Sequence, residues 1–165
     1  MRTTNTSTIA RAFARLERRA WGRKAFPLRY FERRIADPRA VVLALRSPAR
    51  RVAGFLIAVP DGQVRGALYV EDTLLDVPYR GRGLVALLGQ ALEREARRRG
   101  FRYLTRDAKI ANGYADAIER AYGDRILERH DHPSPFGPQR YLRLTLARPA
   151  RPRRVSAPSS RPPRR

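Results

Sequence analysis

The segment Glu71 to Val85, EDTLLDVPYRGRGLV, joins an apolar strand with two acids to a glycine-rich turn that opens an amphipathic helix. Gly81 and Gly83 lack a Cβ atom, so the backbone N–H groups of this turn can approach an anion closely. The helix dipole behind the turn favours negative charge there, and Arg80 and Arg82 add charged donors. The segment therefore predicts a phosphate-binding turn between a strand and a helix.

The helix after the turn is indicated by apolar residues at helical spacing, and Gly100 is expected to end it. The glycine spacing matches neither the G-x-G-x-x-G turn of dinucleotide-binding folds nor the G-x-x-x-x-G-K-[ST] loop of P-loop NTPases. The turn is therefore expected to serve another kind of phosphate site.

The strand, turn and helix resemble the cofactor loop of the GNAT superfamily of N-acetyltransferases, where an R/Q-x-x-G-x-G/A signature wraps the pyrophosphate of acetyl-CoA. Arg80, Gly83 and Val85 fall on its fixed positions, although the last position is Gly or Ala in the family pattern. The resemblance implies backbone contacts from the strand end to the pantetheine arm and further contacts from the turn to the pyrophosphate. The implied cofactor-binding residues are Leu75, Asp76, Val77, Arg80, Gly81, Arg82, Gly83, Leu84 and Val85.

The rest of the chain predicts an α/β fold with a central mixed, mostly antiparallel sheet and helices on its faces. Ser7 or Thr8 is expected to cap the first helix, and Asp37-Pro38 to end the second. The GNAT resemblance implies the same order of elements from about residue 8 to 146, without the family's usual first strand. Helices are predicted over 9–20, 28–35, 84–98 and 113–122, and strands over 40–45, 52–59, 66–77, 103–106, 125–129 and 140–146.

The composition predicts one domain, residues 1–146, followed by a basic tail. Residues 147–165 contain seven arginines, five prolines and no acid, which is typical of a disordered segment. Subtracting these seven charges from the net +21 of the 165-residue chain leaves +14 on the domain. The absence of cysteine, of a signal-peptide pattern and of a membrane-length apolar run predicts a cytoplasmic protein, either a monomer or a homodimer.

Transfer of an acetyl group from a thioester to an amine needs a proton acceptor, and Glu71 and Asp72 precede the turn. Neighbours on a strand point to opposite faces, so only one of them is expected to face the acyl group unless a bulge intervenes. The resemblance to polyamine-type GNAT enzymes implies Glu71 as the base. Asp72 is expected either to hold a cationic substrate or to pair with an arginine.

In the GNAT family an asparagine opens the last helix, and a tyrosine seven residues later protonates the departing thiolate. Asn112 matches the first position and is predicted to contact the cofactor or simply to cap the helix. Position 119 holds glutamate, so Tyr122, three residues further on, is the candidate acid. The alternative for Tyr122 is packing at the helix end.

The sequence therefore predicts an acetyl-CoA-dependent N-acetyltransferase that uses direct transfer to a primary amine on a small molecule, a protein or an aminoacyl-RNA. His130 and His132 share a strand face but have no third ligand nearby, so no metal is expected. The alternative is a basic nucleic-acid-binding or interaction module on an inactive acyltransferase-like scaffold, favoured by Val85 and Glu119. In either case the +14 domain is expected to attract nucleic acid non-specifically.

Overall fold

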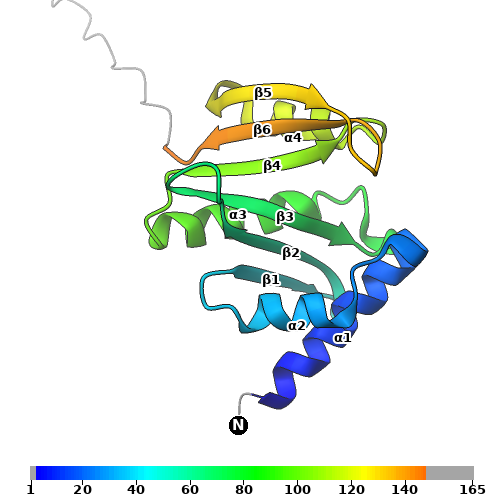
Figure 1. Ribbon diagram of the computed structural model, residues 1–165. Coiled ribbons are helices and arrows are strands. Elements are labelled where there is room, and N and C mark those ends of the chain that lie inside the picture. Colours follow the sequence, from blue (N-terminus) through cyan, green and yellow to red (C-terminus); the bar gives the residue numbers. More distant parts are fainter. Residues whose placement is uncertain (1–2, 148–165) are drawn as a thin grey trace, which may run out of the picture.

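A computed structural model of the chain describes residues 3–147, which form one six-stranded sheet with helices on both faces (Figure 1). The predicted tail lies almost entirely outside the described residues. Within that part of the chain, no helix is long and apolar enough to cross a membrane. The bounds are α1 (Thr3–Trp21), α2 (Leu28–Ala36), β1 (Val41–Arg46), β2 (Val52–Pro60), β3 (Ala67–Leu75), α3 (Leu84–Arg98), β4 (Tyr103–Lys109), α4 (Tyr114–Tyr122), β5 (Ile126–His132) and β6 (Gln139–Thr145).

The predicted mixed α/β class and element order are confirmed, while several boundaries differ. α1 begins at Thr3, so Ser7 and Thr8 lie inside the helix and do not cap it. All six residues of 3–8, TTNTST, are of types that cap helices well, and a sequence pattern alone does not choose among them. β4 and β5 each extend three residues beyond their predicted ends, because pairing with β6 continues to Lys109 and His132.

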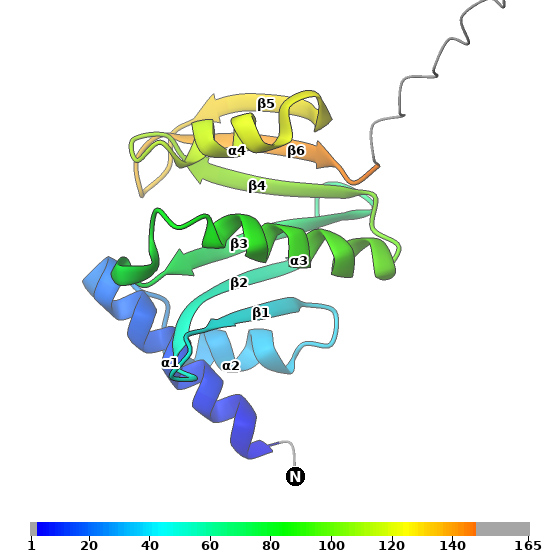
Figure 2. The same ribbon diagram turned by 180° about the vertical axis from the view of Figure 1, so that it is seen from behind.

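The strand order is β1-β2-β3-β4-β6-β5, and every neighbouring pair is antiparallel except β3 with β4. Parallel neighbours need a crossover connection, and α3 provides it. Figures 1 and 2 show α1 and α2 on one face of the sheet and α3 and α4 on the other. The turn that opens α3 therefore lies at the end of β3, beside the parallel pair.

Each face of the sheet has its own hydrophobic core. Under α1 and α2, the ring of Phe13 stacks on Phe55 at 4.4 Å and meets Phe31 edge to face at 6.0 Å. Under α3 and α4 the core is aliphatic and includes Leu88, Leu92, Ala115, Ile118, Leu142 and Leu144. Burial of these side chains holds both helix pairs against the sheet.

A bulge in β3 places two consecutive acids on one face. Asp72 pairs with Ile57 and Val70 pairs with Ala58, so Glu71 is an extra residue on β3. The strand's alternation resets there: Val70 packs in the core under α3, and Leu74 packs in the core under α1. Glu71 and Asp72 consequently both lie on the α1 and α2 face. The sequence analysis expected the two acids to point to opposite faces unless a bulge intervened, and the bulge is present.

The parallel pairing of β3 and β4 ends at the same place. Its four residue pairs run from Ala67 with Tyr103 to Val70 with Arg106, although β3 continues to Leu75 and β4 to Lys109. Figure 1 shows the two strands spreading apart towards their ends. Beyond Val70, the β3 backbone therefore has no β4 partner on that side.

Gly54 on β2 pairs with Leu75, and a Cβ atom at position 54 would lie 2.4 Å from Leu75 Cδ2 and 2.8 Å from the Leu74 carbonyl oxygen. We expect Gly54→Ala to lower the free energy of unfolding by about 1–3 kcal/mol, because a packed neighbour must shift. Urea denaturation measures this change. Gly62→Ala is the matched control, since nothing lies within 4 Å of its added Cβ; equal stability of the two variants would contradict the close approach.

Candidate functional site

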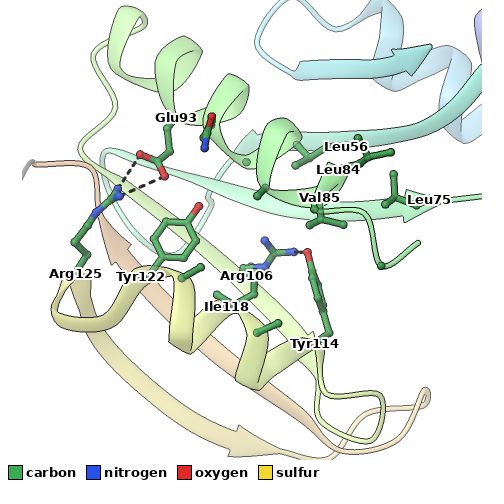
Figure 3. A pocket seen from close by; sticks show the side chains of 17 residues that line it. Leu56, Leu75, Leu84, Val85, Glu93, Arg106, Tyr114, Ile118, Tyr122 and Arg125 are labelled. Carbon is green, nitrogen blue, oxygen red and sulfur yellow. Dashed lines mark hydrogen bonds and ion pairs between the residues drawn. The ribbon is translucent and has the colours of Figure 1, made fainter. Parts of the chain in front are cut away.

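A cavity of about 510 Å³ lies between α3 and α4 (Figure 3). The glycine turn and the start of α3 form one end of it, through Gly81, Gly83 and Val85. Glu93 and Arg125 line the other end, joined by an ion pair at 2.9 Å. Burial alone would raise the pKa of Glu93, but the charge and hydrogen bonds of Arg125, together with hydrogen bonds from Arg97 and Tyr122, hold this pKa below its usual range. The cavity is thus a groove along α3, closed at one end by a charged pair.

The turn has the geometry of an anion cradle. Gly81 and Gly83 both have φ of +71°, and Gly83 is the N-cap of the 15-residue helix α3. Nothing lies within 4 Å of a Cβ added at either glycine, so the space beside the backbone is open. Val85 packs against the core and forms part of the cavity wall. The residues therefore fit a pyrophosphate group at the helix N-terminus.

The other predicted cofactor residues are divided between the groove and its surroundings. Leu75 lines the groove, and its carbonyl oxygen accepts a hydrogen bond from Arg80 Nε at 3.0 Å. The Asp76 carboxylate accepts from the Val77 N–H and pairs with Arg19 at 3.5 Å. Leu84 also lines the groove, whereas Val77 is exposed and Arg82 lies at the exposed surface of the turn.

A second cavity, of about 420 Å³, opens on the α1 and α2 face. Four carboxylates line it, from Glu17, Glu71, Asp72 and Asp107. Asn112 lines this cavity and not the groove, and its Oδ1 accepts from the Tyr114 N–H at 3.1 Å, as a helix-capping residue does. Two sites of different character thus lie on opposite faces of one sheet.

Glu71 and Asp72 have different surroundings despite being neighbours. Tyr30 donates to Glu71 Oε2 at 2.8 Å, and Arg34 pairs with Oε1. Asp72 Oδ2 and Glu17 Oε2, by contrast, are buried without a hydrogen-bond partner among the described residues. Burial, with the Glu17 charge adding to it, raises the pKa of Asp72 to about 8, and burial raises the pKa of Glu17 to about 7. Asp72 and Glu17 therefore both titrate near neutral pH.

Arg106 and Tyr114 line both cavities. The Arg106 guanidinium donates to the Tyr114 hydroxyl and lies 4.8 Å from the centre of its ring, at the middle of the view in Figure 3. Both side chains stand where the pairing of β3 with β4 ends. A molecule bound in the groove and one bound in the second cavity would consequently meet at these two side chains.

The family model of the acetyltransferase (GNAT) family matches residues 7–118, about two thirds of the chain. The chain belongs to the GNAT acetyltransferase family. No curated protein matches it.

Solved structures of GNAT enzymes share the fold. The ribosomal-protein-S18-alanine N-acetyltransferase from Escherichia coli is 20% identical, with a TM-score of 0.67 over 90% of this chain and 92% of that one. The aminoglycoside 6'-N-acetyltransferase from Enterococcus faecium is 16% identical, with a TM-score of 0.67 over 90% and 96%. An N-acetyltransferase from Staphylococcus aureus Mu50 is 15% identical, with a TM-score of 0.70 over 86% and 94%. The mixed sheet with its diverging parallel pair is thus the GNAT fold.

In this GNAT chain, Tyr122 lies at the closed end of the groove. A Cβ added at Gly89 would lie 3.4 Å from its hydroxyl oxygen, so the glycine lets the phenol approach α3. Burial, with the charge of Glu93 adding to it, raises the pKa of Tyr122 to about 12. Its role as the acid stays a prediction, and Tyr114 is the phenol that both cavities share.

The two histidines on β5, His130 and His132, make different contacts. His132 Nε2 lies 2.7 Å from Asp107 Oδ1, and this hydrogen bond raises the pKa of His132. His130 stacks on Tyr141 at 4.9 Å. Among the side chains that the structure describes, no group of three or more His, Cys, Asp or Glu could hold a metal ion.

The sequence analysis did not identify Glu17 or Arg106 as site residues. Glu17 falls four residues after Phe13, on the face of α1 that was expected to be apolar, and only 3% of it is exposed. Arg106 interrupts a strand whose neighbours on the same face are the buried Leu104 and Ala108. A charged residue at a core position was the available signal in both cases.

We expect Asp72→Asn to change how stability depends on pH. Between the ordinary pKa of an aspartate, about 4, and about 8, the unfolded chain has lost the proton that folded Asp72 keeps. Stability therefore falls as pH rises through this window. The variant should show a smaller fall, a higher Tm at pH 8 and an unchanged Tm at pH 4, by calorimetry. Asp124→Asn, at an exposed position, is the control. The same response from both variants would contradict the raised pKa assigned to Asp72.

Proposed function

We propose that the protein is an N-acetyltransferase that transfers an acetyl group from acetyl-CoA to a primary amine by direct attack. The observation that supports it best is that two cavities on opposite faces of the sheet share Arg106 and Tyr114. A donor in one cavity and an acceptor in the other would meet without a covalent enzyme intermediate. The chain also contains no cysteine to serve as a thiol nucleophile.

In this proposal the groove between α3 and α4 holds the donor. Backbone N–H groups of the turn with Gly81 and Gly83 bind the pyrophosphate at the helix N-terminus, with Arg80 and Arg82 near by. The β3 backbone that lacks a β4 partner, up to Leu75, offers hydrogen bonds to the pantetheine arm. One GNAT structure with this fold, an aminoglycoside 6'-N-acetyltransferase with a TM-score of 0.66, was crystallised with coenzyme A.

We assign the proton acceptor to Asp72, with Glu17 as its coupled partner. Glu71, the base implied by the family resemblance, is already bound by Arg34 and Tyr30, and these contacts favour a positioning role for it. A base works best when its pKa lies near the working pH, and burial brings the pKa of Asp72 to about 8. Asp72 is therefore poised to take a proton from the incoming ammonium group.

The acceptor cavity suits an amine that arrives as a cation. Asp72 and Glu17, each with one buried carboxylate oxygen that lacks a hydrogen-bond partner among the described residues, form a local acidic pair inside a domain of strongly positive charge. The exposed rings of Trp21 and Phe136, 6.1 Å apart, line the same cavity and provide apolar surface for the rest of the acceptor. The comparisons with known proteins lend no support to the alternative of an inactive nucleic-acid-binding module.

Acetyl-CoA binding and release of coenzyme A with a panel of primary amines test the proposal. We expect micromolar binding of acetyl-CoA by calorimetry and saturable release of the free thiol with at least one amine. Gly83→Glu should abolish both, because a carboxylate would occupy the anion cradle at the helix N-terminus. Gly62→Glu adds the same charge in a turn after β2 and should retain both; no binding to the unmodified chain would overturn the proposal.

The pH dependence of kcat/KM separates the two candidate bases. With Asp72 as base, kcat/KM should rise with pH up to about 8 and then level off, since the ionised form accepts the proton. Asp72→Asn should lower it by about 10²-fold or more. Glu71→Gln should lose less and keep the same profile. A profile that shifts in Glu71→Gln but not in Asp72→Asn would return the role to Glu71.

A further inference from the structure

Arg106 is a buried cation without a counter-anion. Only 6% of the residue is exposed, and no described carboxylate forms an ion pair with it. Its single side-chain hydrogen bond goes to the neutral hydroxyl of Tyr114. Its Nε is buried and finds no acceptor among the protein groups that the structure describes. Burying such a charge opposes folding, so packing alone gives no reason for an arginine here.

Arg106 and Arg125 are the described arginines that line the two cavities, and Arg125 is neutralised. Arg125, at the closed end of the groove, pairs with Glu93, and Arg34, behind the acceptor cavity, pairs with Glu71. A full hydrogen-bond set for a buried guanidinium requires an acceptor for each N–H group. Of the two described arginines that line the cavities, Arg106 is thus the one whose donors remain available to a ligand.

The position of Arg106 shows which part of a ligand would meet it. It pairs with Val70 as the last residue pair of β3 and β4, and it contributes to the walls of both cavities. Figure 3 shows its guanidinium in the cavity opposite Leu84 and Val85, directed at the Tyr114 hydroxyl. The reacting carbonyl group, which must lie between donor and acceptor, comes to this place in the proposed reaction.

We propose that Arg106 is a catalytic residue that donates hydrogen bonds to the carbonyl oxygen of the thioester and stabilises the oxyanion formed on attack. The inference rests on the proposed function and adds to it the group that polarises the carbonyl. Fixed donors directed at developing charge in a water-poor site are a large source of rate enhancement. A buried guanidinium is such a donor. Its burial without an anion lowers the stability of the free protein, and the oxyanion of the transition state supplies the missing negative charge.

In the proposed reaction each of these groups has one role. The amine, after Asp72 has taken one proton from its ammonium form, forms a bond from nitrogen to the carbonyl carbon, and the C=O electron pair moves to the oxygen facing Arg106. When that pair returns, the C–S bond breaks and its electrons leave with sulfur. The second nitrogen proton is lost to solvent, and Tyr114 is placed to protonate the thiolate and to regain its own proton from solvent. The products are the amide, the free thiol of coenzyme A and one released proton.

Arg106→Met is the most direct test, because methionine replaces the apolar stem of the arginine and removes the charge. For Arg106→Met we expect kcat with acetyl-CoA to fall about 10²-fold or more, a dissociation constant for acetyl-CoA within about threefold, and a Tm equal to or above that of the unmodified chain. Arg106→Lys, which keeps the charge but loses the guanidinium fork, should fall in between. Arg102→Met, at an exposed site just before β4, should leave all three quantities unchanged.

The outcomes separate this inference from its rivals. Full turnover in Arg106→Met would overturn it, as would a loss of acetyl-CoA affinity that matches the loss of kcat, or a lower Tm with unchanged kcat per folded molecule. Succinyl-CoA tests whether Arg106 instead binds a carboxylate on the acyl group. Loss of succinyl but not acetyl transfer in Arg106→Met would establish that role and overturn the oxyanion role. Absence of turnover in the unmodified chain would refute the proposed function itself.

Discussion

The site depends on one interruption of strand pairing. Where Glu71 bulges out of β3, the parallel ladder with β4 stops, and three consequences follow. Two consecutive acids turn to the same face, the β3 backbone beyond the bulge loses its partner on one side, and the sheet opens between its two halves. A bulge of this kind redirects side chains at the expense of pairing. Both cavities and the side chains they share lie around this point.

The site contains charged groups that no described side chain neutralises, on the acceptor face and at the junction of the two cavities. On the acceptor face, Asp72 and Glu17 each have a buried carboxylate oxygen without a described hydrogen-bond partner, and at the junction Arg106 is buried without a described counter-anion. Each arrangement opposes folding, and the phenylalanine and aliphatic cores on the two faces provide the stability that offsets it. Glu71, in contrast, is neutralised by Arg34 and is part of the scaffold.

Local features could be predicted from the sequence, and long-range pairings could not. The glycine turn, the helix after it and the mixed sheet follow from spacing within a few residues. The bulge at Glu71 leaves no mark in the strand's own sequence, because it depends on register with β2. The hydrogen-bond partners of Glu71, Arg34 and Tyr30, lie 37 and 41 residues away. For the same reason the burial of Glu17 and Arg106 without described ion-pair partners could not be predicted, because elements distant in the sequence bury them.

A crystal structure of the full chain with coenzyme A bound tests the central claim most directly, through the position of the sulfur atom. The account predicts the pantetheine arm between α3 and α4 along β3, with the sulfur where β3 and β4 part, within hydrogen-bond reach of Tyr114 or Arg106. A sulfur atom elsewhere, or a cofactor outside this groove, would contradict the claim that the two cavities meet as donor and acceptor sites.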